Sequence, residues 1–320
     1  MIKTLTLNPA VDKAVTIERF AVDKVNRIAT VRLDAGGKGI NVARVLSRLG
    51  APALAVAPVA GGAGRFLDNR LTDEGIPHAF VEVTGETRTN LKVVDPVMGT
   101  HTDINEPGPA LTGADLGRLA DLVFSGLGPD DWVVFSGSVP AGVPKDLYAT
   151  WIEEARVRGA RTVLDADGEL FARGLEGKPD LVKPNRAELE AWAGQKLDTD
   201  EALLDAADRL RAAGVGTVAI SLGSSGAWLV GEGGAWFAPG LKVDAKSTVG
   251  AGDAFLAALT WSFTEGLTPS ECLAMAVATA TASVVKPGTG AGDSADIDAF
   301  LARVAVRHHE HPLPISGRKQ

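Results

Sequence analysis

Short runs of β-branched and other apolar residues alternate along this chain with longer segments of helical periodicity, and no other feature constrains its fold as strongly. Strands are expected over residues 2–7, 132–135, 162–165, 181–183, 217–221 and 227–230. Helices are expected over residues 40–49, 116–124, 147–158, 188–193, 202–213, 254–263 and 270–285. Strands that alternate with helices form parallel sheets, because each parallel neighbour needs a crossover connection. The pattern therefore predicts an α/β protein with a mostly parallel central sheet.

Two segments, 14–34 and 81–106, interrupt this rhythm with extended, alternating sequence. We expect them to pair as a small antiparallel sheet that projects from the body as a lid; two β-hairpins at a sheet edge are the alternative. The rest of residues 1–307 is expected to form one α/β domain. Residues 308–320 contain Pro, Gly and polar residues and are expected to be a flexible tail.

Composition excludes several classes of partner. The chain has a net charge of -8 and contains no dense run of Lys and Arg, which argues against binding to nucleic acid or to an anionic membrane. Its amino terminus reads as a strand and not as a signal peptide, and no apolar segment reaches membrane-spanning length. Cys272 is the single cysteine, so no intramolecular disulfide can form. A cytoplasmic protein is the expectation.

The segment that ends at Asp253 carries the clearest chemical signal. Gly250, Ala251 and Gly252 form a turn before an apolar helix, whose first amides and dipole attract an anion such as phosphate. Because Asp253 is itself an anion, it is predicted to act beside that phosphate as a general base. The alternative is an ordinary helix N-cap. A second Gly-Ala-Gly-Asp, ending at Asp293, leads into polar sequence and is predicted to be a loop and cap.

A second glycine turn opens the helix expected near residue 40. Gly36 and Gly37 allow backbone amides to approach a ligand hydroxyl, and Lys38 and Asn41 follow on the first turns of that helix. The spacing does not match a phosphate-binding Walker A loop, nor does a strand lead into a dinucleotide-binding glycine motif. Lys38 could alternatively be a solvated first-turn residue.

Polar residues also follow the predicted strands one after another: Asn8 and Asp12, Ser136 and Ser138, Asp165, Lys183 and Asn185, and Ser221. In open α/β sheets the ligand lies beyond the carboxyl ends of the strands. So many polar residues in successive units predict one long crevice at that edge of the sheet.

The two glycine segments, GGKGINVAR at 36–44 and STVGAGD at 247–253, resemble the two signatures of the ribokinase-like (PfkB) carbohydrate kinases. The likeness runs from residue 4 to about residue 290. Further segments are similar to the branch of 1-phosphofructokinases and tagatose-6-phosphate kinases: TLNPAVD at 6–12, TRTNLK at 87–92, SGSVP at 136–140 and LVKPNRAEL at 181–189. The resemblance implies a ribokinase-like three-layer α/β/α sandwich with a small β lid.

The resemblance also implies roles for individual residues. Asp253 would be the catalytic base, and the amides from Gly250 through Ala251 and Gly252 to Asp253 would form the anion hole. Residues expected to bind the sugar are Asp12, Gly37, Lys38, Asn41, Asn90 and Ser138, with Arg27 and Arg88 on its phosphate. Residues expected to bind the nucleotide are Lys183, Asn185, Ser221, Gly223, Gly226, Ser247 and Gly252. Asn185 and Glu188 would orient Mg²⁺ through water, although Glu188 could be only a helix first-turn residue.

The expected activity is ATP-dependent phosphorylation of a ketohexose monophosphate, with Mg²⁺ and ATP as cofactors. Fructose 1-phosphate, converted to fructose 1,6-bisphosphate, is the favoured substrate; tagatose 6-phosphate and fructose 6-phosphate are alternatives. A sensor of sugar phosphates that has lost turnover is a more remote alternative. The small lid sheet has too little core to be stable alone, so a homodimer joined through the lids is expected.

Overall fold

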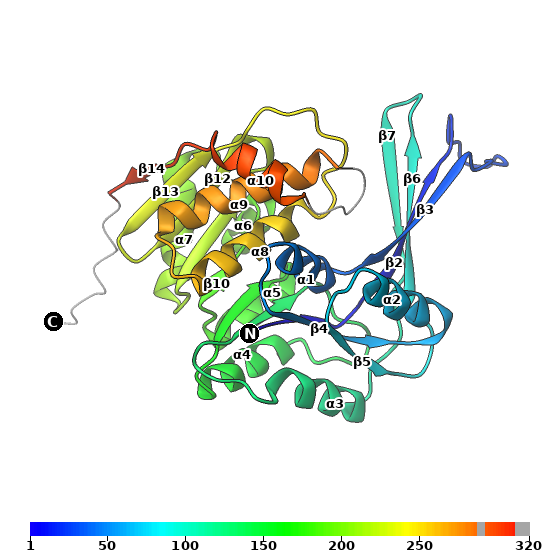
Figure 1. The fold of residues 1–320 in the computed structure, drawn as a ribbon, viewed down its shortest axis with the longest axis horizontal. Coiled ribbons are helices and arrows are strands. Elements are labelled where there is room, and N and C mark those ends of the chain that lie inside the picture. Colours follow the sequence, from blue (N-terminus) through cyan, green and yellow to red (C-terminus); the bar gives the residue numbers. More distant parts are fainter. Residues whose placement is uncertain (287–291, 311–320) are drawn as a thin grey trace.

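A large mixed sheet lies between two layers of helices in the computed structural model, which describes residues 1–286 and 292–310 (Figure 1). Seven strands are parallel, in the order β11-β10-β9-β8-β1-β4-β5. Their bounds are β1 Ile2–Thr6, β4 Ala53–Val59, β5 His78–Glu82, β8 Trp132–Ser136, β9 Arg161–Asp165, β10 Leu181–Val182 and β11 Thr217–Ser221. An antiparallel extension continues from β11 through β12 Gly226–Gly231, β13 Gly234–Pro239 and β14 Arg307–His309.

Helices cover both faces of this sheet because successive strand residues point to opposite sides. One face packs against α1 Lys38–Arg48, α8 Ala251–Thr264 and α9 Pro269–Val284. The other packs against α3 Gly113–Phe124, α4 Leu147–Val157, α5 Gly168–Gly174, α6 Arg186–Ala193 and α7 Asp200–Ala212. In addition, α2 Gly61–Asp73 lies beside α1, and α10 Ser294–Leu301 lies against α9. Within the described residues, no helix is long and apolar enough to cross a membrane.

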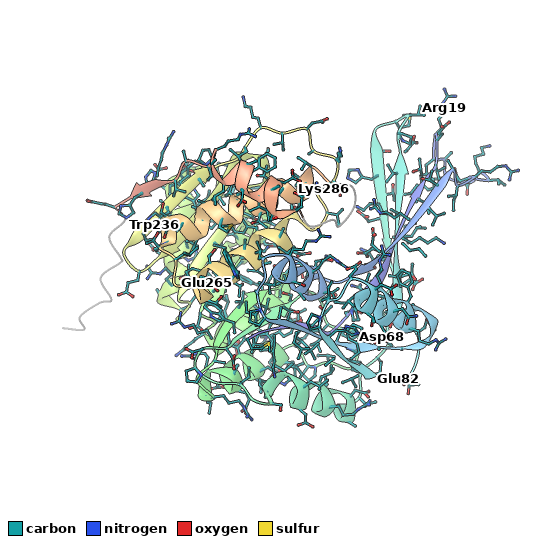
Figure 2. All side chains as sticks on the ribbon, in the orientation of Figure 1. Arg19, Asp68, Glu82, Trp236, Glu265 and Lys286 are labelled. Carbon is teal, nitrogen blue, oxygen red and sulfur yellow. The ribbon has the colours of Figure 1, made fainter. Side chains whose placement is uncertain are left out.

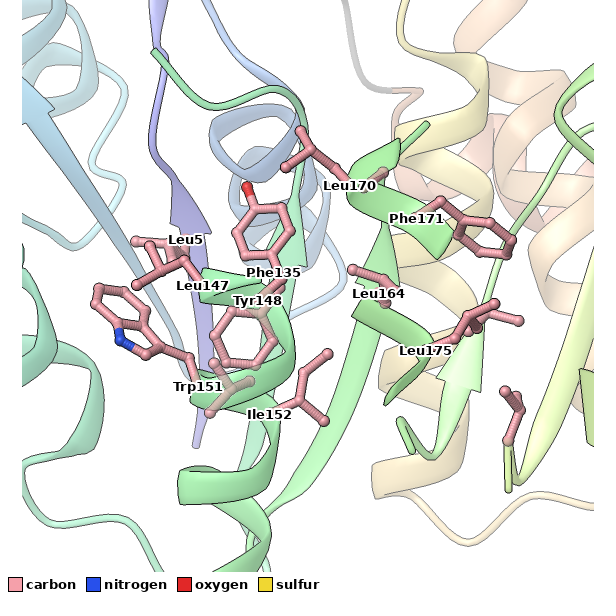
Figure 3. Close-up of a cluster of buried hydrophobic side chains, with 14 of the residues drawn as sticks. Leu5, Phe135, Leu147, Tyr148, Trp151, Ile152, Leu164, Leu170, Phe171 and Leu175 are labelled. Atoms are coloured by element: carbon pink, nitrogen blue, oxygen red, sulfur yellow. The ribbon is translucent and has the colours of Figure 1, made fainter. Parts of the chain in front are cut away.

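The second face holds the larger core cluster. Leu5, Phe135 and Leu164 come from three adjacent parallel strands and are fully buried against Tyr148 and Ile152 of α4 (Figure 3). Fully burying a side chain of this size stabilises the fold by about 1.5–3 kcal/mol. This continuous core holds the carboxyl ends of the strands at one rigid edge, where the polar residues follow.

The lid is a separate four-stranded sheet in the order β3-β2-β6-β7, and it stands away from the body (Figure 1). Its strands are β2 Ala10–Thr16, β3 Thr30–Gly36, β6 Arg88–Asp95 and β7 Thr100–Asn105. The expected bounds were wrong at three ends: the lid begins at residue 10, extends to 36, and resumes only at 88, because residues 81–82 belong to β5. A wholly antiparallel lid was also wrong, since β2 and β6 are parallel. Both strands continue from parallel strands of the main sheet, β1 and β5, so the chain enters the lid twice in the same direction.

All seven expected helices and all six expected strands are present, and the fold class is confirmed. Helix α2 escaped prediction because Gly61, Gly62 and Gly64 are poor helix formers. A distant carboxylate supports its first turn instead: Glu86 Oε1 accepts from the backbone N–H of Ala63 at 2.6 Å. The tail was expected from residue 308, but β14 includes residues 308 and 309; residues 311–320 lie outside the described part.

Candidate active site

A cavity of about 820 Å³ lies between the lid and the body. One wall is the lid face that carries Asp12, Asp34, Asn90, Lys92 and Asp103. The opposite wall consists of the first turn of α1 and the segment 245–249. Expected site residues that line the cavity are Asp12, Gly37, Lys38, Asn41, Arg88, Asn90 and Ser247. Segments far apart along the chain, within residues 12–41, 88–105 and 245–249, thus contribute to one cavity.

Asp253 is in the first turn of α8, immediately next to this cavity. The N-cap of α8 is Gly250, whose φ of 81° favours glycine, so Asp253 is not the capping residue. Its carboxylate is buried, and its Oδ2 accepts from Nδ2 of Asn41 at 2.8 Å. Burial raises the pKa of Asp253 to about 6, helped by the charge of Asp165 and opposed by the Asn41 hydrogen bond and by nearby lysines. A carboxylate with this pKa is a good proton acceptor near neutral pH.

The structure confirms the prediction that Asp293, which ends the second Gly-Ala-Gly-Asp, is a helix cap. Asp293 is the N-cap of α10, and its side chain accepts from the amide of Asp296 at 3.0 Å. It also forms an exposed ion pair with Lys286 at 3.0 Å. The two aspartates that end identical tetrapeptides therefore differ in burial and in partners, whereas the loop predicted around residues 290 and 291 lies outside the described residues.

Asp165 lies behind the cavity and binds two lysines. Its Oδ1 is 3.0 Å from Nζ of Lys38 and 3.3 Å from Nζ of Lys183, and all three side chains are buried or half-buried. Although burial alone would raise it, the pKa of Asp165 is held below its usual range by Lys183 and Lys38. Conversely, the pKa of Lys38 is raised by Asp165, against the effect of its own burial. The sequence indicated only that Asp165 ends a strand. Its pairing with Lys38 and Lys183 could not be predicted, because neither lysine is close to it in the sequence.

The turn before α8 has the features of an anion site. Its amides at the helix start have no intrahelical partners, and Lys183 lies directly beside it. A Cβ added at Gly252 would be 3.4 Å from Nζ of Lys183, so this glycine leaves the space between the amides and the ammonium group open. Polyanionic phosphate groups of a nucleotide fit this combination of amides and a buried cation.

On the lid side, Asp12 and Arg88 lie close together. Oδ1 of Asp12 accepts from Nδ2 of Asn90 at 3.0 Å, and burial raises the pKa of Asp12. Arg88 donates from Nη1 to the backbone carbonyl of Glu106 at 3.2 Å, while its Nε has no partner within the described residues. Arg88 therefore keeps donors for an anion in the cavity.

Two expected sugar-site residues lie elsewhere. Ser138 is not in the cavity lining; its Oγ accepts from Nδ2 of Asn8 at 3.3 Å, just beyond the ends of β1 and β8. Arg27 is exposed in the loop 17–29 of the lid and does not line the cavity of its own chain. Figure 2 shows Arg19, from the same loop, near the tip of the lid. The role of Arg27 stays a prediction.

Five of the expected nucleotide residues lie near the ends of β10 and β11: Lys183, Asn185, Ser221, Gly223 and Gly226. Ser247 lines the cavity beside the lid instead, and Gly252 is in the first turn of α8. Asn185 forms a β-bridge with Ser221, and Gly223 and Gly226 bound the short 3₁₀ turn Gly223–Ser225. Gly223 is exposed, and a Cβ there would meet no atom within 4 Å, so the turn leaves open surface beside it.

Asn185 and Glu188 close a capping box at the start of α6: Asn185 Oδ1 accepts from the Glu188 amide at 2.9 Å, and Glu188 Oε2 accepts from the Asn185 amide at 2.8 Å. These contacts are those of a helix first-turn residue, and the role of Asn185 and Glu188 in orienting Mg²⁺ stays a prediction. Among the described residues, no group of three or more His, Cys, Asp or Glu could hold a metal ion. A single carboxylate such as Glu188 is still compatible with Mg²⁺, which usually binds one or two carboxylates together with water and substrate phosphates.

A family model described as pfkB family carbohydrate kinase matches residues 5–296. The 1-phosphofructokinase of Rhodobacter capsulatus is 43% identical over 87% of this chain and 88% of its own length, and that of Escherichia coli K12 is 37% identical over 96% and 98%. The solved phosphofructokinase-2 of Escherichia coli, in complex with substrates and products, has a TM-score of 0.90 at 32% identity, over 94% of this chain and 98% of its own. That protein has also been solved as a tetrameric inhibited form.

Proposed function

The chain belongs to the pfkB family of carbohydrate kinases, and from this premise we propose that it phosphorylates fructose 1-phosphate with ATP, giving fructose 1,6-bisphosphate. The observation that carries the proposal is the buried Asp253 beside a phosphate-binding glycine turn, at the edge of a cavity that holds Arg88. The relatives named 1-phosphofructokinase, at 43% and 37% identity, favour fructose 1-phosphate over fructose 6-phosphate.

In the proposed reaction, Asp253 accepts the proton of the free primary hydroxyl of the sugar. That oxygen attacks the γ-phosphorus in line, and the bond from phosphorus to the β-phosphate oxygen breaks, releasing ADP. The amides at the start of α8 and Lys183 stabilise the charge on the transferring group. Mg²⁺, oriented by Glu188 and Asn185, would neutralise charge on the nucleotide phosphates.

The lysines that flank the base contribute to the same step. Asp165 fixes Lys38 on the sugar side and Lys183 on the phosphate side, so one buried carboxylate positions two cations around the reacting groups. Their positive charges also oppose the rise in the pKa of Asp253. At neutral pH this base is therefore mostly ionised and ready to accept a proton.

The assembly proposed here is a homodimer joined through the lids. One row across the lid face that points away from the cavity consists of Leu33, Lys13, Leu91 and Ile104, so it is apolar except for Lys13, and Val31 lies in the next row. Leu33, Val31 and Ile104 are exposed, an arrangement that usually marks an interface. From the sequence, Ile17, Phe20, Ile28, Leu91 and Val93 were the expected contact residues, and this was wrong for Ile17 and Val93, which are buried within the lid itself. A location in the cytoplasm stays a prediction.

An ADP-release assay with a panel of sugar phosphates tests the substrate. Fructose 1-phosphate, fructose 6-phosphate and tagatose 6-phosphate are compared at equal concentrations with ATP and Mg²⁺. We expect the highest kcat/KM with fructose 1-phosphate. Higher kcat/KM with a 6-phosphate would move the proposal to that substrate, and no ADP release with any of them would favour the sensor alternative.

A further inference from the structure

A chain of buried polar contacts runs from Asp253 through α1 to the end of α2. Nδ2 of Asn41 donates to Oδ2 of Asp253 at 2.8 Å, and Nη1 of Arg44 donates to Oδ1 of Asn41 at 2.9 Å. Nε of Arg44 donates to Oε2 of Glu74 at 2.7 Å, and its Nη2 donates to the backbone carbonyl of Ala35 at 3.1 Å. Arg44 is only 7% exposed and is not in the cavity lining.

This chain of contacts allows only one orientation of the Asn41 amide. A guanidinium group has donors and no acceptor, whereas an ionised carboxylate has acceptors and no donor. The amide can therefore satisfy both neighbours only with its oxygen toward Arg44 and its nitrogen toward Asp253. With the amide reversed, its NH₂ group would face the Arg44 guanidinium, and its oxygen would face the Asp253 carboxylate. Neither pair could form a hydrogen bond.

Arg44 is itself held on three sides. Glu74 compensates its buried charge and is bound in turn by Arg70 at 3.0 Å, at the carboxyl end of α2. The carbonyl of Ala35 lies just before the GGKG turn, so the same guanidinium also contacts the segment that lines the sugar side of the cavity. An arginine is suited to this position because its rigid fork can meet three acceptors at once, whereas a lysine ammonium is a single point charge.

We propose that Arg44 is a positioning residue for the catalytic base, which it serves by fixing the orientation of Asn41 and, through it, the carboxylate of Asp253. The inference rests on the proposed function for the role of Asp253. Arg44 contacts neither the cavity nor the base directly. Its only route to the base among its hydrogen bonds is through Asn41, since its other two partners, Glu74 and the Ala35 carbonyl, make no hydrogen bond to Asp253 within the described residues.

The consequence is a change in the proton affinity of the base. The charged groups that face Asp253 are Asp165, Lys38 and Lys183, and within residues 1–286 and 292–310 the neutral side-chain donor to its carboxylate is Asn41. Without Arg44 the amide is free to rotate, and the carboxylate loses a donor that favours its ionised form. Asp253 then takes up a proton at higher pH than the wild-type residue does.

The first test is the pH dependence of kcat/KM for fructose 1-phosphate in Arg44→Met, Arg44→Lys and the wild type. Arg48→Met is the matched control, since Arg48 is exposed on the same helix one turn later. We expect the acidic limb of the profile to move up by about one pH unit in both Arg44 variants. The ionisation of the sugar phosphate is common to all four proteins and cancels in the comparison.

At pH 6 this shift lowers kcat/KM by about fivefold, and the difference nearly vanishes at pH 8. A loss by the same factor at every pH, or a profile equal to that of Arg48→Met, would overturn the proposal. A wild type without kinase activity would contradict the proposed function instead and leave the second test to decide on Arg44.

The second test needs no turnover. The carboxyl carbons of aspartate are labelled with ¹³C, the Asp253 signal is assigned by its absence in Asp253→Asn, and its titration is followed by NMR in the free protein. Arg44→Lys, which keeps the charge opposite Glu74, serves if Arg44→Met does not fold. A higher Asp253 pKa in the Arg44 variants than in Arg48→Met supports the positioning role, and equal values refute it.

Discussion

At the scale of single residues, Asp253 combines two properties that oppose each other. It is buried, which disfavours its charge, and the proposed reaction needs that charge. Lys38, Lys183 and Asn41 stabilise the charged carboxylate but do not fully offset the effect of burial, so the pKa of Asp253 is about 6. Active-site groups commonly keep such unfavourable environments because their reactivity depends on them.

Asp253→Asn should lower kcat by a factor on the order of 10²–10⁴, the usual contribution of a positioned general base, while ATP binding is nearly unchanged. Asp293→Asn is the matched control: it alters the second Gly-Ala-Gly-Asp, whose Asp only caps α10. Steady-state kinetics and a nucleotide-binding titration measure both effects. Comparable losses of kcat in the two variants would show that Asp253 is not the base.

The same substitution should stabilise the protein above pH 6. Because the folded-state pKa of Asp253 is raised, the folded protein binds a proton between about pH 4 and pH 6 that the unfolded chain has released. This stabilising contribution is lost as pH rises through 6. Asp253→Asn carries no charge to bury, so its free energy of unfolding at pH 7.5 should exceed the wild-type value by about 1–3 kcal/mol.

Urea denaturation at pH 7.5 and at pH 4.5 measures this difference. The advantage of the Asn variant should shrink at the lower pH, where the wild-type carboxyl is protonated in the folded state. A difference that is the same at both values would mean that the buried charge is not its cause.

At the scale of elements, the lid depends on one carboxylate near its tip. Asp95 is buried and accepts from the backbone amides of Arg19 and Phe20 on one side and of Val97 and Met98 on the other, at 2.8–3.1 Å. It therefore joins the loop 17–29 to the β6–β7 turn. Charge-assisted hydrogen bonds of this kind are stronger than neutral ones.

Asp95→Ala should release this loop while the body of the protein is unchanged. Hydrogen exchange read by mass spectrometry should show faster exchange in peptides from residues 17–29 and no change in those from α4. Asp103→Asn, which removes an exposed ion pair with Lys92 in the same sheet, is the control. Unaltered exchange of the loop in Asp95→Ala would show that other contacts hold it.

At the scale of the whole molecule, the single chain leaves apolar side chains on the outer face of the lid uncovered. The loop 17–29 contributes Phe20 to a small cluster with Val15, Ile17 and Val93, but Leu33 and Ile104 remain 40% and 51% exposed. A two-fold pairing would let the same patch on two copies cover itself.

Leu33→Asp should therefore shift the protein from dimer to monomer in light scattering at micromolar concentration, because it places a charge on the apolar surface of the proposed interface. Val157→Asp changes an equally apolar residue on α4 that is 80% exposed and should have no effect on mass. A wild type that is already monomeric, or a Leu33→Asp variant that stays dimeric, would contradict pairing through this face.

Local sequence determined the elements of the body and the residue types of the site. The alternation of strands and helices fixed the fold class, and the GGKGIN and GAGD segments located Lys38, Asn41 and Asp253, because turns, helix starts and apolar periodicity depend on residues a few positions apart. The body that these patterns predict is the one observed, and the family comparison agrees with it.

Only the tertiary structure decided which of these residues meet. Asn41 and Asp253 are separated by 212 positions and Lys38 and Asp165 by 127, so no local pattern could pair them. The parallel pairing inside the lid follows from where β1 and β5 end in the main sheet, and the orientation of Asn41 follows from Arg44 and Glu74 on two helices. Each depends on packing between elements distant in sequence, and that packing also decides whether a Gly-Ala-Gly-Asp buries its carboxylate or leaves it in water as a cap.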